Sequence, residues 1–406
     1  MAIQNSEDIK AILLNQSAGP LFMELAEDLS ERLGSVLLIT GSEIESDREG
    51  LMIKKGPAYN RRTIASRALS ALLFLLYTLR EVLAHKSTVP ILAVSNPPLL
   101  PAVALLLRLI RRQPYMVLVY DIYPDIPRRL GVLSNRAVLK IWEFVNKYIF
   151  LYARNVITLG PHMARTLEEK YSAHGAGERI TIIPTWVDTG TFAPKRKRDN
   201  FFARNNMQVD KLTVLYSGNI GLTHDISLLI DAAVCMRDDP RISFLIIGEG
   251  RDKTSLMEKA KVHDLKNVTF LPLQPEESMP YSLACADVSI VSIRDGIEGL
   301  MMPSKTYYAM AVGSAIIGLS RSQSDVAHVI QESRCGVNIE PNDLNGLVGA
   351  IRMLADNRSL LDQFKLAARR AACERYARCV LSPSFVNLFA TFQSTEKGHD
   401  FGETAF

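Results

Sequence analysis

One stretch in the second half of the chain arranges small, polar and cationic residues in an order that suits binding of a phosphate ester. Gly296 and Gly299 form a loop after an apolar run, and Pro303 and Ser304 then open a segment with helical spacing. Ser304 is expected at the N-cap and Lys305 in the first turn, where the helix dipole disfavours a cation unless an anion also binds there. Lys305 and free backbone N–H groups together could hold a diphosphate. A solvated surface lysine is the alternative interpretation.

Glycines also stand at the ends of two predicted strands in the same half. The apolar run Leu212–Ser217 leads into a Gly-Asn-Ile-Gly turn that begins at Gly218, and the run Ile242–Gly248 ends on a glycine. A glycine at such a point lets the backbone pass close to a ligand. A helix is expected from Ile226, so its free N–H groups would point into the turn. An ordinary tight turn explains the motif equally well, and no GxGxxG dinucleotide fingerprint is present.

Two residues of the first half could act on a hydroxyl group. Asp121 directly follows a buried apolar run, and a carboxylate there could orient an acceptor hydroxyl or act as a base. The alternative is a helix-capping Asp or a salt bridge with the nearby Arg128 or Arg129. His162 stands close to the end of another apolar run and could contact a donor or an acceptor, although a lone His is more often structural.

The elements that must position these residues are short, nearly continuous apolar runs that alternate with helical patterns. Such runs are typical of parallel strands buried on both faces, and the alternation predicts βαβ units. Ligands of such sheets bind beyond the carboxyl ends of the strands, so the site is expected in a cleft between two sheets. We expect strands at Ala11–Asn15, Val36–Thr40, Pro90–Ser95, Met116–Tyr120, Val156–Leu159, Ile180–Ile183, Leu212–Ser217, Ile242–Gly248, Val268–Leu271, Val288–Ser292, Ala315–Leu319 and Gly336–Ile339.

The length of 406 residues suits two domains. The polar, charged segment Pro194–Lys211 lacks an apolar period and is predicted to be a linker. We therefore expect an α/β protein with two Rossmann-like domains facing a cleft, an acceptor-binding domain over 1–200 and a donor-binding domain over 201–385. Residues 386–406 are expected to form a tail that is partly helical and then frayed.

Charge is concentrated in one segment of the chain. The net charge is +4 overall, but residues 54–147 contain 15 Lys or Arg against 4 Asp or Glu, which gives 15 − 4 = +11. The apolar runs Ala68–Leu79 and Leu99–Ile110 lie beside these bases and are shorter than the roughly 20 residues of a spanning helix. The segment predicts docking on an anionic membrane surface, with a core helix flanked by solvated bases as the alternative.

Other features narrow the location and the partners. Five Cys are scattered without a CxxC, as expected for reduced thiols in the cytoplasm, and the polar start of the chain does not read as a signal peptide. No stacking aromatics alternate with the bases, so nucleic acid is not an expected partner. We expect a cytoplasmic protein that is peripheral on the inner face of the cell membrane.

The order of the motifs in the second half resembles the donor domain of retaining GT-B glycosyltransferases of family 4, in the branch that builds bacterial surface polysaccharides. This resemblance covers about residues 212 to 380. In the first half, Asp121, Tyr123, Pro124 and Asp125 resemble an Asp-aromatic-Pro-acid signature of the acceptor domain. The donor-domain motifs are Gly218-Asn219-Ile220-Gly221, Ile247-Gly248-Glu249-Gly250, Asn267-Val268-Thr269-Phe270-Leu271, Ala286-Asp287 and Pro303-Ser304-Lys305 with Gly313.

The resemblance implies a retaining hexosyltransferase. The donor would be a nucleotide-diphosphate sugar, with UDP favoured. The basic segment 54–147, rather than the resemblance, suggests a lipid-linked glycan on a polyprenyl diphosphate as the acceptor. No metal or other cofactor is expected. The predicted catalytic residues are Asp121 and His162. The predicted donor-binding residues are Gly19, Gly218, Asn219, Gly221, His224, Gly248, Leu271, Glu298, Gly299, Leu300, Met301, Met302, Ser304, Lys305 and Tyr308.

The chain also departs from the pattern of that family. Leu300 and Tyr308 stand where the family often has a pair of Glu, and Glu298 lies near the first of these positions. Asn219 and His224 replace an Arg and a Lys that follow the first strand. Two other functions therefore stay open, a nucleotide-sugar epimerase on the same fold and a non-catalytic partner of another transferase.

Overall fold

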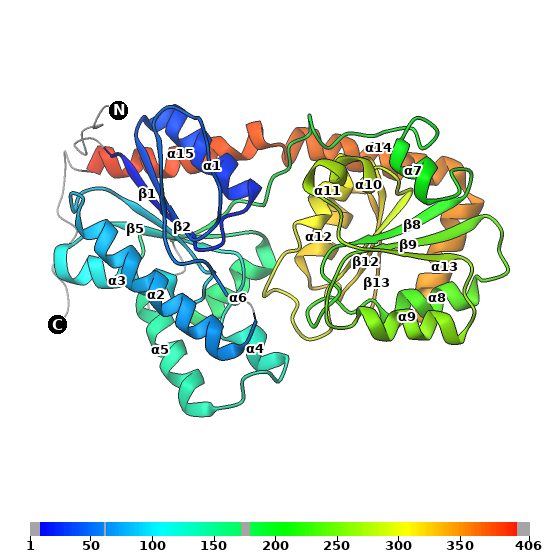
Figure 1. Ribbon diagram of the computed structural model, residues 1–406, viewed down its shortest axis with the longest axis horizontal. Helices are drawn as coiled ribbons and strands as arrows, with labels where there is room; N and C mark the ends of the chain where they lie inside the picture. The colour runs from blue at the N-terminus through cyan, green and yellow to red at the C-terminus, as the bar shows by residue number, and fades with distance from the viewer. Residues whose placement is uncertain (1–8, 61, 172–178, 396–406) are drawn as a thin grey trace.

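The computed structural model describes residues 9–60, 62–171 and 179–395. Two α/β domains lie side by side, each built on a parallel sheet with helices on its faces (Figure 1). The first sheet has seven strands in the order β3-β2-β1-β4-β5-β6-β7, and the second has six in the order β10-β9-β8-β11-β12-β13. The expected architecture of two Rossmann-like domains facing a cleft is therefore confirmed. The start of the chain up to residue 8 and the expected frayed tail beyond Thr395 lie outside the described ranges.

The N-terminal domain contains one strand that the apolar runs did not predict. This strand, β3 (Leu51–Lys55), lies at the edge of the sheet, and Leu51 is its one buried residue. Because an edge strand needs little apolar surface, its LMIKK sequence lacks the continuous apolar run of its neighbours. The other elements are β1 Ala11–Leu14, α1 Pro20–Leu33, β2 Val36–Thr40, α2 Ile64–Leu83, β4 Ile91–Val94, α3 Leu100–Arg111, β5 Tyr115–Val119, α4 Asp125–Arg129, α5 Arg136–Tyr152, β6 Asn155–Thr158, α6 Pro161–Tyr171 and β7 Ile180–Ile182.

The predicted linker contains a short helix, α7 (Phe201–Asn206), which corrects the expectation of an irregular segment. Asn200 caps this helix by accepting from Phe202 N, and Phe202 is buried against the second sheet. The remaining elements are β8 Leu212–Ser217, α8 Ser227–Cys235, β9 Ile242–Ile247, α9 Lys253–Val262, β10 Val268–Leu271, the 3-10 helix η3 Glu276–Ser278, α10 Met279–Leu283, β11 Val288–Ser292, α11 Lys305–Ala311, β12 Ala315–Leu319, α12 Asp325–Ser333, β13 Gly336–Ile339, α13 Leu344–Asp356, α14 Arg358–Arg375 and α15 Arg378–Thr395.

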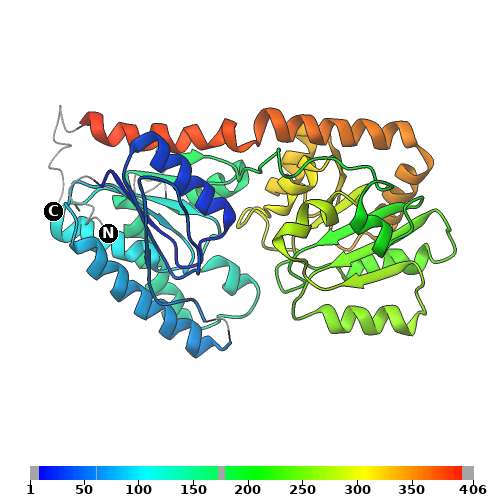
Figure 2. The same cartoon turned by 45° about the horizontal axis from the view of Figure 1, so that its top comes forward.

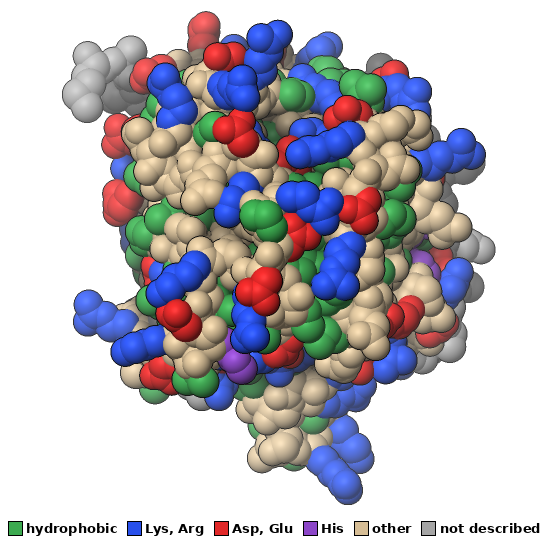
Figure 3. All heavy atoms as spheres, turned by 90° about the vertical axis from the view of Figure 1, so that its right-hand side faces the viewer, with side chains coloured by type: hydrophobic (Ala, Val, Ile, Leu, Met, Phe, Trp, Pro, Cys, Tyr) green, Lys and Arg blue, Asp and Glu red, His purple; other side chains and the backbone are tan. Residues whose placement is uncertain are grey.

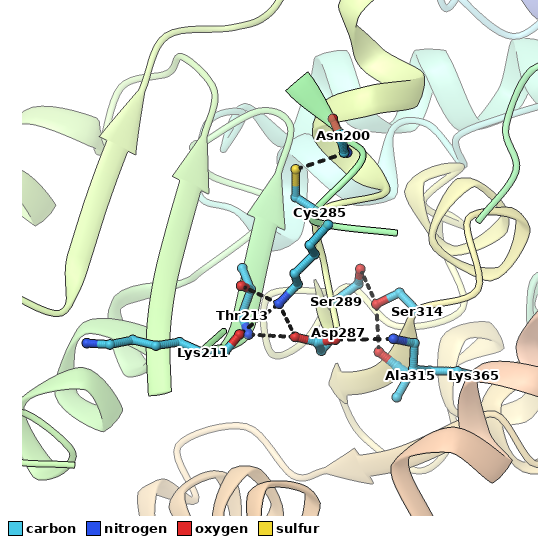
Figure 4. Close-up of polar contacts among 10 residues, drawn as sticks. Asn200, Lys211, Thr213, Cys285, Asp287, Ser289, Ser314, Ala315 and Lys365 are labelled. Carbon is cyan, nitrogen blue, oxygen red and sulfur yellow. Dashed lines mark hydrogen bonds and ion pairs between the residues drawn. The ribbon is translucent and has the colours of Figure 1, made fainter. Parts of the chain in front are cut away.

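A charge network holds the start of β11 in place. The Asp287 carboxylate accepts from Thr213 N at 3.0 Å, pairs with Lys365 Nζ at 3.2 Å and forms an ion pair with Lys197 (Figure 4). Burial opposes the ionisation of Asp287, but the two lysines outweigh it and lower the pKa of its carboxyl. Strands β8 and β11, the linker and α14 are thereby tied together at the end of the sheet away from the cleft.

The chain crosses between the two domains again before its end. Val187 pairs with Ala377 in a parallel bridge, and Val187 N donates to Tyr376 O at 2.9 Å. Helix α15 then packs on α1 of the first domain, where Arg378 pairs with Asp28 at 2.6 Å. Figure 2 shows α14 and α15, in orange and red, along one side of both domains. The expected domain end at residue 385 therefore lies inside a helix that belongs to the first domain's core.

Candidate functional site

A cavity of about 550 Å³ lies between the two domains at the carboxyl ends of the strands. It is lined by loops that follow β1, β5 and β8 and by the segment that leads into α11. Among the described residues that line it, Asp121 is the one carboxylate and Lys305 the one ammonium. The predicted site residues that line the cavity are Gly19, Asp121, Gly218, Asn219, His224, Met301, Met302, Ser304, Lys305 and Tyr308.

Lys305 is held over the face of an aromatic ring. Its Nζ lies 4.2 Å from the centre of the Tyr216 ring and donates to Tyr216 Oη at 2.9 Å. Burial lowers the pKa of Lys305 to about 7, and no described carboxylate forms an ion pair with it. A Cβ on Gly218, whose φ is +137°, would come within 3.2 Å of the Lys305 Nζ. The ammonium group therefore has no described counter-charge and lies beside Gly218, which has no side chain to cover it.

Ser304 occupies the N-cap position of α11, as predicted, but its side chain does not cap the helix. Its backbone is already helical, with φ −59° and ψ −26°, and its hydroxyl makes no capping hydrogen bond. An N-cap residue usually has an extended backbone that aims its oxygen back at the first turn. The expected capping role of the Ser304 hydroxyl is therefore wrong, although the residue lines the cavity.

Two glycines behind the Gly-Asn-Ile-Gly turn allow it to approach the next strand. A Cβ on Gly248 would lie 1.9 Å from Gly218 O, and one on Gly250 would lie 2.1 Å from Ile220 O. Both have a positive φ, of +152° and +156°. Tyr216 Oη also donates to Asn219 O at 2.6 Å, which links the turn to Lys305. Gly248 thus packs beneath the turn and does not line the cavity.

His224 borders the cavity as a neutral ring. Its Nδ1 lies 2.8 Å from Ser292 O, so Nδ1 carries the proton and Nε2 is left as an acceptor. Burial, together with the charge of Lys305, lowers the pKa of His224 to about 3. The family that the sequence resembles has a Lys at the position of His224. The neutral His224 therefore does not supply the positive charge that this Lys would carry.

Asp121 lies where the two domains meet. Its backbone forms an antiparallel bridge with Met301 of the second domain, and Ile122 N donates to Leu300 O at 2.9 Å. No described cation pairs with the Asp121 carboxylate, and burial raises its pKa to about 6. The alternative of a salt bridge to Arg128 or Arg129 is wrong. Arg128 pairs with Asp125 and Glu143, while Arg129 Nη1 donates to Gly296 O at 2.8 Å.

Several predicted site residues lie outside the cavity lining. The His162 ring faces His328, with ring centres 6.2 Å apart, at a separate contact between the domains. Glu298 Oε2 accepts from Gly296 N at 2.9 Å and so stabilises its own loop. The others are Gly221, which packs against the Asn219 side chain, Gly299, which faces His162 and Thr166, Leu300, which is fully buried in the core, and Leu271, at the end of β10.

Residues that sequence reasoning passed over also line the cavity. Asn15 and Ser17 follow β1, Thr185 follows β7, and Gln274 follows β10. All four stand beyond the carboxyl ends of parallel strands, which is where the rule for α/β sheets places ligand contacts. That rule, applied to every strand rather than to those with glycine or charged motifs, would have found them.

Comparison with known proteins finds a family model that matches most of the second half of the chain. Residues 197–371 match the model of the family described as glycosyl transferases group 1. A probable glycosyltransferase of Pseudomonas aeruginosa, WbjE, is 24% identical over 342 residues, which span 80% of this chain and 83% of WbjE. WcaI of Escherichia coli (strain K12), whose name describes a colanic acid biosynthesis glycosyl transferase, is 30% identical over 201 residues, about half of each chain.

A solved structure shares the fold over nearly the whole chain. The crystal structure of Anabaena Alr3699/HepE in complex with UDP and glucose superposes with a TM-score of 0.71 at 14% sequence identity. The match covers 95% of this chain and all of that one. The chain therefore has the GT-B fold, in which two parallel-sheet α/β domains enclose a cleft.

Proposed function

We propose that this protein is a retaining glycosyltransferase that moves a sugar from a nucleotide-diphosphate sugar, a UDP-sugar, to a lipid-linked glycan in surface polysaccharide synthesis. The observation that carries the proposal is the cleft itself, where Asp121 of one domain and Lys305 of the other line one cavity. The match to the group 1 family model supports glycosyl transfer. The UDP and glucose bound to HepE support the donor class, and the name of WcaI supports the polysaccharide.

Lys305 would bind the diphosphate of the donor. Without a ligand, burial keeps its pKa low because no described carboxylate stabilises the cation. A bound diphosphate would supply that negative charge and stabilise the protonated lysine. The neutral ring of His224 adds no charge of its own, so the departing diphosphate would be stabilised by one preorganised cation and by backbone N–H groups of the neighbouring turn.

Asp121 would act on the acceptor hydroxyl. With a pKa of about 6, its carboxylate is ionised at neutral pH and basic enough to accept a proton. The bridge to Met301 fixes it against the segment that leads to Lys305, so the acceptor hydroxyl and the donor would meet at this seam. Retention of the anomeric configuration would follow if the hydroxyl attacks from the face that the diphosphate leaves.

The N-terminal domain would bring the protein to a membrane that holds the acceptor. Helix α2 exposes a helical stripe of leucines, Leu69, Leu72, Leu73 and Leu76, the last of them 58% exposed. Helix α3 packs beside α2, and α5 packs beside α3, and both expose further apolar side chains among the basic residues of this segment. Such surfaces suit an anionic bilayer. At the far end of the C-terminal domain, acidic and basic side chains intermingle instead (Figure 3). Among the described residues, no helix has the length and hydrophobicity to cross a membrane.

A thermal-shift screen tests the donor site. The purified protein is heated with UDP, GDP, dTDP and CMP and with their common sugars, because a ligand that binds the folded state raises the melting temperature. We expect a shift with uridine compounds, followed by sugar transfer to lipid-linked acceptors. Conversion of the free nucleotide sugar without an acceptor would indicate an epimerase. Donor binding without any turnover would indicate a non-catalytic partner.

Vesicle flotation tests the membrane surface. We expect the protein to float with vesicles that contain anionic phosphatidylglycerol and to lose this binding when Leu72 and Leu76 are both changed to Glu. The matched control is Leu366→Glu, because Leu366 is an exposed apolar residue of the C-terminal domain. Equal binding by wild type and the double variant, or loss of binding by the control as well, would contradict a specific role for α2.

A further inference from the structure

A further contact joins the two domains near the crossing at Val187 and Ala377, because Gly160, Asp325 and Tyr376 line one small cavity. Asp325 is the first residue of α12 in the C-terminal domain and is only 1% exposed. Its Oδ1 accepts from His162 N at 2.8 Å and its Oδ2 from Met163 N at 3.1 Å. Both donors belong to the first turn of α6 in the N-terminal domain. One carboxylate of the C-terminal domain therefore caps a helix of the other domain.

Helix α6 has no N-cap side chain of its own and is capped by Asp325, whereas α12 has a cap of its own. The residue before α6 is Gly160, which has no side chain to accept from the first turn. Helix α12 is capped by Ser324, whose Oγ accepts from Ala327 N at 3.0 Å. The carboxylate of Asp325 is thus not needed to cap its own helix. The first N–H groups of α6 would otherwise be left without partners.

The electrostatics of the contact are equally specific. The N-termini of α6 and α12, each with the partial positive charge of a helix start, converge on the single negative charge of Asp325. A Cβ on Gly160 would lie 2.3 Å from Asp325 Oδ1, so only glycine leaves room for the carboxylate. Burial raises the pKa of Asp325 even though the bonds from His162 and Met163 favour the ionised form. The cost of burying this charge therefore outweighs what the two bonds contribute to its ionised form.

The first turn of α6 also touches the loop that carries the donor-side residues. A Cβ on Gly299 would lie 3.0 Å from Thr166 Oγ1 and 3.3 Å from His162 O. The same loop continues to Met301, which is bridged to Asp121. The loop that carries Gly299 and Met301 is therefore contacted from the N-terminal domain both by α6, which Asp325 caps, and by Asp121.

We infer that Asp325 is a positioning residue, an interdomain clasp that holds α6 and so keeps the cleft closed with Asp121 against the loop before Lys305. When the domains separate, the carboxylate regains water and α6 loses its cap, while the backbone pairing of Val187 with Ala377 persists as the hinge. The clasp itself does not depend on what the cleft binds. Only its effect on turnover rests on the proposed glycosyl transfer.

The clasp is tested by the distance between the domains in the ligand-free protein. Spin labels are attached to cysteines that replace Ala68 on α2 and Lys261 on α9. Both positions are exposed, one in each domain, and both helices lie away from α15 (Figure 1). In every variant Ser replaces the three cysteines that are not buried, Cys235, Cys373 and Cys379.

We expect Asp325→Ala to shift the distance distribution to longer values, because loss of a charge-assisted contact lowers the closed-to-open ratio roughly 10-fold or more. The matched control is Asp343→Ala, since Asp343 caps its own helix α13 by accepting from Gly346 N at 2.8 Å and joins no domains. An unchanged distribution in Asp325→Ala would overturn the clasp, as would an equal shift in Asp343→Ala.

A second variant covers the case in which Asp325→Ala does not fold. Gly160→Ala leaves Asp325 in place but puts a methyl group where its carboxylate must lie, so we expect the same shift to longer distances. Gly349→Ala is its control, because nothing lies within 4 Å of the added methyl group there. A Gly160→Ala protein with the wild-type distribution would also overturn the clasp.

Turnover separates the clasp from the proposed activity. In an active preparation, we expect both clasp variants to lower kcat about 10-fold, with donor affinity changed less, since the donor residues lie on the C-terminal domain. Loss of donor affinity with an unchanged kcat would contradict a positioning role. If the wild type proves inactive, the distance measurements still decide the clasp.

Discussion

Two carboxylates of this protein stand at opposite ends of parallel strands and meet opposite surroundings. Asp287 precedes β11 and is paired with Lys197 and Lys365, which lower its pKa against the cost of burial. Asp121 follows β5, has no paired cation among the described residues, and has a pKa raised by burial to about 6. The same residue type thus has two paired cations at the start of one strand and no described counter-charge after the end of another.

The lysines repeat this difference. Lys197 is held by Asp287, by Lys211 O at 2.8 Å and by Thr213 Oγ1 at 2.9 Å, so its hydrogen bonds are satisfied within the protein. Lys305 has the phenol and ring of Tyr216 but no described carboxylate. A partly buried charge that the protein leaves without a counter-charge is a candidate for ligand binding. The comparison therefore separates a lysine whose charge is paired within the protein from one that is a candidate for ligand binding.

The largest effect is expected from breaking the closed network. Asp287→Ala would leave Lys197 buried without its counter-charge and should lower the free energy of unfolding by about 3–5 kcal/mol. Urea unfolding followed by circular dichroism measures this. Asp210→Ala is the control, because Asp210 pairs with Arg198 at the surface, where such a pair contributes about 0–1 kcal/mol. Equal losses in the two variants would contradict the contrast between buried and exposed pairs.

Asp121→Asn should instead remove activity and spare the fold. We expect kcat to fall at least about 100-fold, the lower end of what a general base contributes, while the melting temperature stays within error. The neighbour Asp125 provides the control, because it pairs with Arg128 and Lys170. Asp125→Asn should lower stability. An Asp121→Asn enzyme with the wild-type rate would remove this residue from the mechanism.

Lys305→Ala should weaken donor binding by about 1.5–3 kcal/mol, the scale of a hydrogen bond to a charged group. Isothermal titration calorimetry with the nucleotide identified by the thermal screen measures the change. Lys266→Ala serves as control, since Lys266 is an exposed lysine of the same domain. If the affinity of Lys305→Ala matches that of the wild type, the diphosphate binds elsewhere.

A smaller effect is expected in the pH dependence. The profile of kcat/KM should be bell-shaped, because Asp121 must be ionised above about pH 6 and Lys305 protonated below about pH 7 in the free enzyme. In the profile of kcat, the alkaline limb should move to higher pH, because a bound diphosphate favours the cation. Lys305→Arg should remove that limb, and its persistence would assign it to another group.

The same lysine predicts a change of stability with pH. Because the pKa of Lys305 is lower in the folded protein than in the unfolded chain, the folded protein binds fewer protons above about pH 7. This contribution to stability should therefore rise with pH from about 7 to the ordinary pKa of a lysine. Thermal unfolding of the ligand-free protein beside Lys305→Met measures it, and equal slopes for the two proteins would contradict the lowered pKa.

The sequence by itself determined the layout of the fold. All twelve strands expected from apolar runs are present, because a parallel strand buried on both faces must be apolar throughout. Strand β3 was not predicted because an edge strand does not need to be apolar throughout. The helix in the linker was not predicted because its burial rests on two residues, Phe202 and Ala203, within a charged segment.

The chemistry of the site was decided only by the tertiary structure. The sequence predicted that Asp121 and Lys305 follow strands. Their lack of described counter-charges depends on residues far away in the chain. For example, Arg129 donates to Gly296 O and does not pair with Asp121. The hydrogen bonds from α6 to Asp325 join segments more than 160 residues apart, so no local sequence pattern predicts them. The burial of a strand follows from the apolar residues of the strand itself, so the sequence predicts it. The ionisation of a side chain and the contacts between domains depend on distances between residues far apart in the chain, and only the packing of the domains sets these distances.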